Sequence, residues 1–557
     1  MKIIGANICV RPTGKRIRDA GVCLLEDGAP IVAIAEERIT RKKHDWSLSN
    51  SFSYCLDAAD CRPEDIDMYV FSICGTKTPN VDFVYKCLLS DGINIEKSKI
   101  VICPSHHLSH AASAFFASGF DDSIILVADR DGSILDGSER TVFPNSVEHV
   151  SCYIGRGNEI RLIDRDESFH GDIGLGLGYS YVTEWLGFEG HSMAGKTMAL
   201  ASYGEKGAFG SAHFFVYSNG RIQCTLEPID SNKSLAVRRL IHKKTGIDIG
   251  AHCRDYGSKK AFDIARLVQD DLEQVLIKKL RYLREKNGMK NLCFAGGVAL
   301  NCRLNYKIHK AGIFDNFFIQ PAAGDTGQCL GNALYGYHIV SGQHGKYKMK
   351  HAYLGKKYSR TEIGEAISIY SGKIEVERPS NLYEHIAEKL FQGKIVAWFQ
   401  GRSEFGPRAL GARSILASPA LPEMREKLNK EIKFREWFRP FGVIVLKEYS
   451  GEFFDFEQES PFMLIAPQVR KNVRDRIPSA VHVDSSCRIQ TVDAQTNGNL
   501  HQLLTAFYAK AGIPVLINTS FNIQGEPIVE TPLDALKCFL HSSMTCLVME
   551  DYVITKK

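Results

Sequence analysis

The stretch NLCFAGGVALNCRLN, residues 291–305, decides the class of fold. It reads as an apolar strand, a pair of glycines and then a helix, which is the repeating unit of α/β proteins. A second stretch, NFFIQPAAGDTGQCLGNALYG (316–336), repeats the same plan. Ligands of such sheets bind beyond the carboxyl ends of the strands, so both glycine turns predict part of a ligand cleft.

The segments around these two stretches support an α/β assignment. KIIGANI (2–8) predicts a strand, and residues 21–37 predict a hairpin that turns at Asp27-Gly28. Residues 262–288 have helical spacing that ends at Gly288. A hairpin followed by α/β units is typical of the actin-like or sugar-kinase-like nucleotide-binding fold.

Length and composition predict a protein with more than one domain. A chain of 557 residues is too long for a single hydrophobic core. The text becomes polar and basic near residues 340–360, so we expect one domain at 1–345 and another at 346–557. A net charge of +5 is small for this length and does not call for nucleic acid as a partner.

The same composition predicts a cytoplasmic protein. No apolar run approaches the ~18 residues that span a bilayer, so we expect no membrane segment. The first residues read as a strand rather than a signal peptide. Sixteen cysteines without a CxxC pair favour reduced thiols over a disulfide framework.

A histidine-rich stretch, SHHLSHAASAFF (105–116), is a candidate metal site at the start of a helix. His106 and His110 have i,i+4 spacing, and His107 and His110 have i,i+3 spacing, so the pattern does not choose between the pairs. Carboxylates at nearby strand ends, Asp129 and Asp325, are the expected further ligands. Two imidazoles with two carboxylates suit Fe(II), Mn(II) or Zn(II), and the alternative is that the histidines hydrogen-bond to backbone.

The glycine turns suggest a phosphate-binding role. Backbone N–H groups at Gly296-Gly297 and at Gly324 could hold a phosphate at a helix start, and Lys196 in AGKTMALASYG could meet one. The alternatives are two structural turns and a solvated lysine.

The second half of the chain offers a basic constellation that suits phosphate. Arginine forks match phosphate geometry, and a strand-end serine can add an oxyanion cradle. The alternative is a set of surface arginines in structural ion pairs. The candidates are Arg402, Arg408, Arg413, Lys433, Arg435, Arg439, Arg488 and Ser520, which stands between Asn518 and Asn522.

Several long motifs occur in one order along nearly the whole chain. They are AEERITRKKHD (35–45), HHLSHAASAFF, AGKTMALASYG, AGGVALN, GDTGQCLGNAL, GRSEFGPRALGARSILASP, KFREWFRPF and NTSFNIQGEPIV. With these motifs the chain resembles the O-carbamoyltransferases of antibiotic and nodulation-factor biosynthesis.

The resemblance implies a two-step reaction on two domains. The N-terminal domain would be similar to the tRNA threonylcarbamoyl-transfer protein, and the C-terminal α/β domain to threonylcarbamoyl-adenylate synthase. The C-terminal domain would convert carbamoyl phosphate and ATP, with Mg, into carbamoyl-adenylate. An iron-dependent or other divalent-metal site in the N-terminal domain would then transfer the carbamoyl group to the hydroxyl of a small-molecule acceptor.

The resemblance also assigns roles to individual residues. It places the metal ligands at His106, His110, Asp129 and Asp325, and a contact to the adenylate or carbamoyl group at Lys43. We expect the cofactor-binding residues to be Gly296, Gly297, Asn301, Gly324, Asp325 and Lys196. The carbamoyl-phosphate pocket that the resemblance implies consists of Arg408, Lys433, Arg488, Ser520 and Asn518.

Two positions depart from the family pattern. Arg18 in RDAGVC replaces a family histidine, and His44 and His191 are candidates for its role. VADRDG replaces the commoner VDGxG, so Asp131 is a rival ligand to Asp129. The alternatives to an ATP-dependent carbamoyltransferase are tRNA threonylcarbamoyl transfer and a non-catalytic nucleotide-binding protein of the same fold.

Overall fold

The computed structural model describes residues 1–10, 16–17, 19–75, 80–134, 147–168, 173–190, 193–227 and 233–557. These residues form two compact units. Unit 1 comprises Met1–Pro30 and Cys61–Lys348, and unit 2 comprises Ile31–Asp60 and Met349–Lys557. The sequence analysis assigned residues 31–60 to the first domain, whereas here they group with the C-terminal part of the chain. The division into two functional domains stays a prediction.

Unit 1 contains two sheets of the same topology. When the five main strands of each sheet are numbered along the chain, they lie across the sheet in the order third–second–first–fourth–fifth. The first strand is antiparallel to the second and parallel to the fourth. The strands of the first sheet are β1 (Lys2–Val10), β3 (Gly21–Glu26), β4 (Ala29–Ala35), β5 (Met68–Cys74) and β6 (Ile100–Ile102), with β2 (Arg16–Ile17) on β1. Those of the second are β7 (Asp122–Ala128), β8 (Val147–Arg156), β9 (Glu159–Ser168), β12 (Asn291–Ala295) and β13 (Asn316–Ile319). The division between the units falls within β4, whose residues 31–35 are assigned to unit 2.

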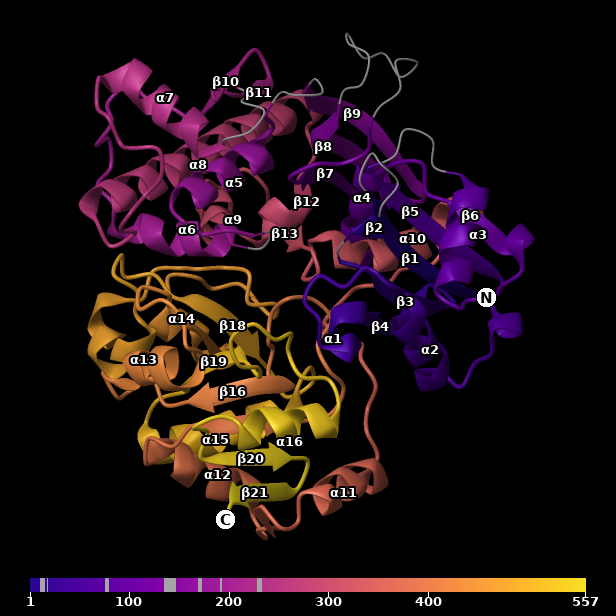
Figure 1. The fold of residues 1–557 in the computed structure, drawn as a ribbon, viewed down its shortest axis with the longest axis vertical. Coiled ribbons are helices and arrows are strands. Elements are labelled where there is room, and N and C mark those ends of the chain that lie inside the picture. Colours follow the sequence, from indigo (N-terminus) through magenta and orange to yellow (C-terminus); the bar gives the residue numbers. More distant parts are fainter. Residues whose placement is uncertain are drawn as a thin grey trace. The chain divides into compact units, whose positions relative to one another are not determined.

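Two helices lie between these sheets (Figure 1). Helix α10 (Gln328–Tyr335) covers β1, β3 and β5, while α4 (His106–Ser118) covers β7, β8 and β12, and the two helices pack on each other. Because nearly every residue of α4 is buried, this interface is a core of unit 1. The duplicated topology confirms the expected α/β class and its actin-like N-terminal part.

The other helices of unit 1 flank the sheets. The long helix α8 packs against α5, α6 and α9, and the hairpin of β10 and β11 lies on it. These elements are α3 (Val81–Ser90), α5 (Leu175–Trp185), α6 (Ala194–Leu200), β10 (Phe215–Ser218), β11 (Arg221–Cys224), α7 (Lys233–Thr245), α8 (Lys259–Asn287) and α9 (Cys302–Lys310). The predicted hairpin and the predicted long helix, with Gly288 as its left-handed C-cap, are confirmed.

Short 3₁₀ turns separate the glycines from the helices that were expected to begin there. The turn η4 (Gly297–Leu300) follows β12, and α9 begins only at Cys302. Likewise η5 (Asp325–Gly327) precedes α10. The expectation of a helix directly after each glycine turn is therefore wrong in detail, because a short 3₁₀ turn comes first.

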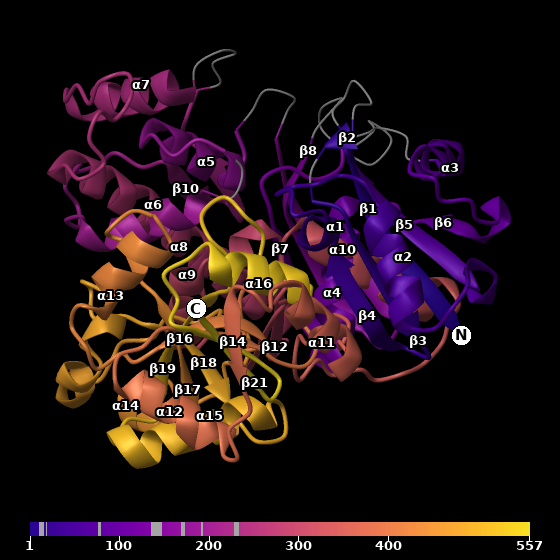
Figure 2. The ribbon, with the colours of Figure 1, turned by 60° about the horizontal axis from the view of Figure 1, so that its bottom comes forward.

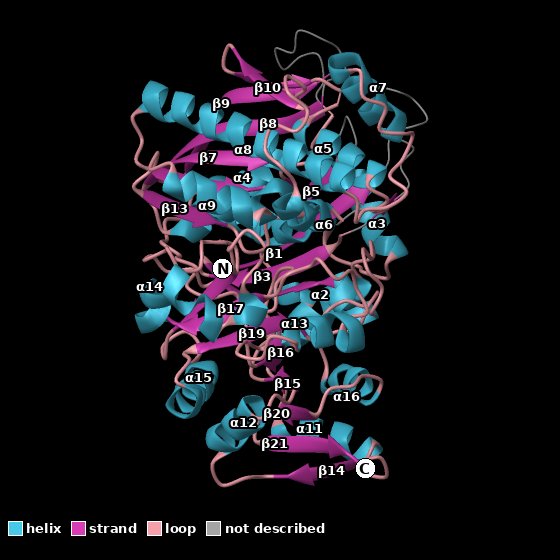
Figure 3. Cartoon of the chain, turned by 90° about the vertical axis from the view of Figure 1, so that its left-hand side faces the viewer, coloured by secondary structure: helices cyan, strands magenta, loops and turns pink. Residues whose placement is uncertain are grey.

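Unit 2 is built on one mixed sheet of eight strands. Figure 3 shows the strands one after another from β17 through β19, β16, β15, β20 and β21 to β14, and β18 pairs with β17 at the other end. They are β14 (Ile374–Glu377), β15 (Val396–Phe399), β16 (Arg413–Ala417), β17 (Gly442–Leu446), β18 (Arg488–Val492), β19 (Val515–Ser520), β20 (Cys546–Met549) and β21 (Tyr552–Lys556).

Helices cover this sheet, and α12 and α15 lie side by side (Figure 2). Two short helices from residues 31–60, α1 and α2, also belong to unit 2. The helices are α1 (Glu36–Thr40), α2 (Ser49–Ala58), α11 (Arg360–Ile369), α12 (Leu382–Phe391), α13 (Met424–Lys427), α14 (Ser450–Phe453), α15 (Gly498–Ala511) and α16 (Pro532–Leu540).

Candidate functional site

The histidine stretch forms the first turns of α4. Ser105 is the N-cap, and its Oγ accepts a hydrogen bond from the Leu108 amide at 3.2 Å. The sequence left two histidine pairs open, and the structure separates them. His107 turns away, with Nδ1 2.7 Å from Ser151 Oγ. Burial lowers the pKa of His107 to about 3, so its ring is neutral and belongs to the packing behind the site.

His106 and His110 face two carboxylates. Asp129 follows the buried strand β7, and Asp325 opens the turn after β13, so both lie past strand ends of one sheet. His110 Nε2 lies 3.2 Å from Asp129 Oδ2, and His106 Nε2 lies 3.5 Å from Asp325 Oδ1. The four candidate ligand atoms all lie within 4.8 Å of one another. The structure thus brings the four predicted side chains together.

The donor set fits a divalent metal. Both ring nitrogens of His110 and Oδ2 of Asp129 are buried and make no hydrogen bond of good geometry within the described part of the chain. Buried polar atoms normally have a bonding partner. A divalent cation is a suitable partner for two imidazoles and two carboxylates. Whether these residues are metal ligands stays a prediction. Asp131, the rival, is outside the cluster, and its carboxylate contacts Arg130 Nε at 3.3 Å.

The charges of the cluster determine which of its side chains carry a proton. Burial favours a neutral His106, but Cys74 and Asp129 outweigh it and raise the pKa of His106 well above its usual range. Burial would raise the pKa of Asp129, yet the two histidines hold it well below its usual range. A cation that binds here must displace the protons on the imidazoles. The affinity of the cluster for the cation therefore rises with pH.

Further groups that the sequence analysis did not single out touch the cluster. Cys9 Sγ lies 3.7 Å from Asp325 Oδ2, and Cys9 is the register partner of Cys74 on the neighbouring strand. Gln328 Nε2 lies 3.1 Å from His106 Nδ1, while Ser72 Oγ donates to Gln328 Oε1 at 2.7 Å. These contacts orient one imidazole and one carboxylate of the candidate metal site.

The glycine turn after β12 serves the close approach of two strands. Gly296 has φ +85°, and a Cβ there would lie 2.2 Å from the carbonyl oxygen of Ala128. A Cβ on Gly297 would lie 3.1 Å from Asp129 Oδ1, so this turn borders the carboxylate cluster. By contrast, a Cβ on Gly324 would meet no described atom within 4 Å. Both turns remain candidates for binding the adenylate.

Two predicted cofactor-binding residues have structural contacts. Asn301 is the N-cap of α9: its side chain accepts from the Leu304 amide at 3.1 Å and donates to Gln269 Oε1 at 3.0 Å. Lys196, on α6, is half-buried, with Nζ 5.2 Å from the centre of the Phe188 ring. A cofactor role for either residue stays a prediction.

The structure describes only some of the residues that bear on the departures from the family pattern. Arg18 and His191 lie outside the described residues. His44 lies in the loop between α1 and α2, and its amide donates to Glu37 Oε2 at 2.9 Å. Lys43 is exposed in the same loop and thus belongs to unit 2.

Unit 2 holds a cluster of cations in which Lys433 is buried and three arginines are half-buried. Burial lowers the pKa of Lys433 well below its usual range, and the charges of Arg435, Arg439 and Lys43 add to this effect. Burial and its neighbours Arg439 and Arg488 likewise lower the pKa of Arg435. Like charges at close quarters are unfavourable unless an anion joins them.

Strand register assembles this cluster. Gly442 of β17 is the register partner of Arg488 on one side and of Asn518 on the other. The Arg488 Nε atom is buried and makes no hydrogen bond within the part of unit 2 that the structure describes. Lys433 Nζ donates to the carbonyl oxygens of Ser520 at 2.9 Å and Asn522 at 2.7 Å. The predicted residues Lys433, Arg488, Ser520 and Asn518 therefore lie close to one another.

The arginines of the GRSEFGPRALGARS motif differ in their surroundings. Arg413 is fully buried and donates to the backbone carbonyls of Gln400 and Gly401. Arg402 donates to the carbonyls of Gly355 and Leu354. Their guanidinium groups hold loops together, which corrects the expectation that they bind phosphate. Arg408 is half-buried in the same loop.

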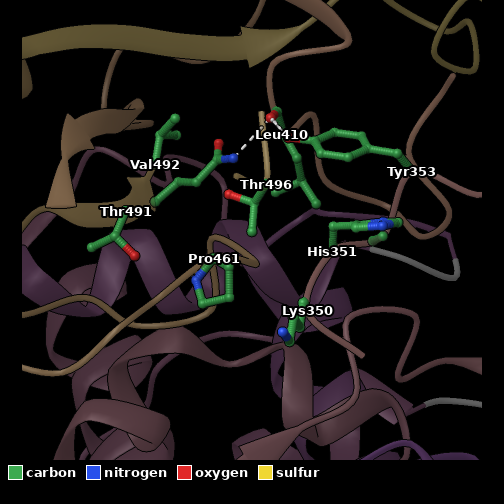
Figure 4. Close-up of a pocket in the computed structure, with 10 residues that line it drawn as sticks. Lys350, His351, Tyr353, Leu410, Pro461, Thr491, Val492 and Thr496 are labelled. Carbon is green, nitrogen blue, oxygen red and sulfur yellow. Dashed lines mark hydrogen bonds between the residues drawn. The ribbon is translucent and has the colours of Figure 1, made fainter. Parts of the chain in front are cut away.

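A small pocket of unit 2 lies beside this loop (Figure 4). Its volume of about 10 Å³ suits a single water molecule and no substrate. Gln490 and Tyr353 both donate to the carbonyl of Leu410 at its wall, at 2.8 and 2.7 Å. This pocket is part of the packing rather than a binding site.

Comparisons with known proteins agree with this arrangement. The family model "Carbamoyltransferase N-terminus" matches residues 13–80 and 76–334, and "Carbamoyltransferase C-terminus" matches residues 387–556. Nodulation protein NolNO of Sinorhizobium fredii is 33% identical over 97% of this chain and 79% of its own length. Nodulation protein NolO of Bradyrhizobium diazoefficiens is 33% identical over 81% of this chain and 79% of its own length.

Solved structures match more distantly. Full-length HypF in its phosphate- and nucleotide-bound form covers 62% of this chain over 56% of its own, with 12% identity and a TM-score of 0.38. The ROK hexokinase of Thermus thermophilus covers 62% of this chain over its whole length, with 11% identity and a TM-score of 0.31.

The chain belongs to the carbamoyltransferase family, because its family models match most of the sequence. The protein is accordingly an enzyme that transfers carbamoyl groups. Across the described residues, no helix is long and apolar enough to cross a membrane.

Proposed function

We propose that the protein is an ATP-dependent O-carbamoyltransferase that works in two steps. In the first step, water hydrolyses carbamoyl phosphate to carbamate and phosphate, and a carbamate oxygen then attacks the α-phosphorus of Mg-ATP and displaces pyrophosphate. In the second, the hydroxyl of a small-molecule acceptor attacks the carbamoyl carbon and AMP leaves. Splitting the reaction replaces a sluggish acyl donor with an activated one that is held away from water.

The cation cluster of unit 2 supports the assignment of the first step. Lys433, Arg435 and Arg488 are three buried or half-buried cations whose charges repel one another. A dianionic phosphate among them would offset that repulsion, and the fork of Arg488 matches its geometry. Ser520 and Asn518 would fix its orientation, and exposed Lys43 would contact the phosphate end of the nucleotide.

The carboxylate–imidazole cluster of unit 1 is the observation that carries the proposal for the second step. Four ligand-type side chains converge there, three buried and Asp325 half-buried, and the ring nitrogens of His110 have no hydrogen-bond partner within the described chain. His106, His110, Asp129 and Asp325 would hold Fe(II) or another divalent metal. Such a metal would supply Lewis acidity toward the carbamoyl carbonyl or the adenylate phosphate. The adjacent turns at Gly296-Gly297 and Gly324 would receive the adenylate.

Incubation with carbamoyl phosphate and Mg-ATP tests the proposal. Purified, metal-loaded protein should release both phosphate and pyrophosphate with no tRNA present, and omission of carbamoyl phosphate should abolish the pyrophosphate signal. Mass spectrometry with a panel of alcohols, including sugars and aminoglycosides, should then find an acceptor that gains one carbamoyl group. Absence of both releases would overturn the proposal, and a strict need for tRNA would favour threonylcarbamoyl transfer instead.

A further inference from the structure

A buried carboxylate lies at the N-terminus of α4, the helix that carries the candidate ligands His106 and His110. Glu148 lies on β8 and is fully buried. Its Oε1 accepts a hydrogen bond from Ser105 Oγ at 2.7 Å. Its Oε2 accepts from the amides of His107 at 3.3 Å and Ser133 at 3.0 Å. These three hydrogen bonds tie the carboxylate to the N-cap and first turn of α4 and to Ser133.

Glu148 belongs to a network that satisfies the first three free amides of α4. The amide of His106 donates to Ser133 Oγ at 2.9 Å, that of His107 to Glu148, and that of Leu108 to Ser105 Oγ. The first amides of a helix have no partner within the helix, so this network fixes where α4 begins and how it is rotated. Rotation of α4 in turn decides whether His106 and His110 face Asp129 and Asp325.

The charge of Glu148 also matters for a cation at this place. The aligned peptide dipoles of a helix give its N-terminus roughly half a positive charge, which repels a metal bound at the first two turns. A carboxylate at that end offsets the repulsion. Arg165 NH2 lies 2.9 Å from Glu148 Oε1, and this pair keeps the carboxylate ionised in the interior.

We propose that Glu148 is a positioning residue of the metal site, which fixes the first turn of α4 and neutralises the positive helix end beside the bound cation. This inference rests on the proposed function, since it presumes that the cluster of unit 1 binds a divalent metal. Among the described residues, Glu148 makes no hydrogen bond to a candidate ligand atom of the cluster and acts through Ser105, His107 and Ser133.

The chain offers a matched control. Glu36 is another fully buried glutamate at the start of a helix: its carboxylate accepts from the amides of Asn50 at 3.2 Å and Ser51 at 2.7 Å in α2. That helix carries no histidine. Glu36→Gln therefore removes the same kind of helix-capping charge without touching the metal helix.

Metal affinity is the readout, measured with Co²⁺ on the full-length apo protein by calorimetry and by its visible absorption. Glu148→Gln should weaken Co²⁺ binding about 10- to 100-fold, as loss of an outer contact of a metal site does. Glu36→Gln should leave it within about threefold while lowering thermal stability to a similar extent. An unchanged affinity in folded Glu148→Gln would overturn the inference.

Two further variants separate the possible causes of weaker Co²⁺ binding. In Glu148→Gln the guanidinium of Arg165 keeps its place beside residue 148, so the double variant Glu148→Gln/Arg165→Gln also removes that positive charge. The double variant should bind Co²⁺ as weakly as the single one, and recovery of wild-type affinity would refute the role of the Glu148 charge. If Glu148→Gln does not fold, Ser105→Ala should still weaken binding about three- to tenfold, and no change would count against the inference. Failure of the wild type to bind Co²⁺ would overturn the metal site itself, which distinguishes the two failures.

Discussion

Replacement of Gly296 by alanine should disturb the candidate metal site through the backbone alone. Gly296 has φ +85°, and its missing Cβ leaves room for the carbonyl of Ala128, the last residue of β7. The next residue is Asp129, whose carboxylate pairs with His110 at 3.2 Å. Any movement that relieves the new methyl group therefore passes directly to this carboxylate.

The size of the effect follows from the contact distance. An alanine Cβ would lie 2.2 Å from the Ala128 oxygen, whereas ordinary contact begins at 3.4 Å, so one strand end must move by about 1 Å. With φ +85° and ψ 159°, Gly296 occupies a backbone region that is nearly exclusive to glycine and costs an L-residue about 1–3 kcal/mol. An overpacked core costs about 1–3 kcal/mol more. We expect a total loss of about 2–6 kcal/mol in the free energy of unfolding. A displacement of 1 Å at a reacting centre is also worth about 100-fold in the transfer rate.

Gly288→Ala is the matched control, because Gly288 also has positive φ, at +71°, but a Cβ there meets no described atom within 4 Å. It should lose only the cost of the left-handed backbone, about 1–2 kcal/mol, and keep its metal affinity. Urea unfolding and Co²⁺ titration of both variants give the comparison. Equal losses of stability, or full Co²⁺ affinity in Gly296→Ala, would refute the argument that this glycine permits close strand approach beside Asp129.

Three more predictions follow from individual side chains. Asp129→Asn should weaken Co²⁺ binding at least about tenfold, whereas Asp131→Asn should leave it within about threefold, and a calorimetric titration with the reverse order would contradict the choice of Asp129. His107, Arg165 and hydrogen bonds oppose the effect of burial and lower the pKa of Glu148 from 4.5 to about 2. Its contribution of about 3 kcal/mol is thus complete above pH 4.5 and is lost as the pH falls toward 2. Acid unfolding followed by circular dichroism should be less steep in Glu148→Gln, and an unchanged profile would argue against this pairing. Lys433→Met should weaken carbamoyl phosphate binding at least about tenfold. Lys430→Met changes an exposed residue of the same segment and should not weaken it. Equal affinities of the two variants in calorimetry would exclude Lys433 from the pocket.

The local pattern of the sequence predicted the strands, the hairpin and the long helix, because alternation, turn residues and caps are local signals. It also placed Asp129 and Asp325 at strand ends, where the parallel strands β7, β12 and β13 bring them together. Spacing alone left His106 and His107 equivalent. The choice depends on helix rotation, which contacts with Ser151 and Glu148 determine from a distant strand.

Other features were beyond sequence reasoning because they depend on contacts that are remote in the chain. Glu148 looks like an ordinary residue of a strand, and nothing near it in sequence marks it as a hydrogen-bond partner of the first turn of α4. Arg413 and Arg402 look like phosphate ligands among glycines, yet tertiary structure directs them to backbone carbonyls. Residues 31–60 group with unit 2 although they follow directly on the first strands. Such assignments need the fold, since no local signal carries them.

The central claim, that two separate sites catalyse two consecutive steps, is tested most directly by assaying the two half-reactions in a pair of variants. Pyrophosphate release from ATP and carbamoyl phosphate reports the first step, and carbamoyl transfer to an alcohol from preformed carbamoyl-adenylate reports the second. His110→Ala should abolish transfer and leave pyrophosphate release nearly intact, whereas Arg488→Ala should abolish pyrophosphate release and retain transfer from the supplied intermediate. Loss of both half-reactions in either folded variant would contradict the two-site account.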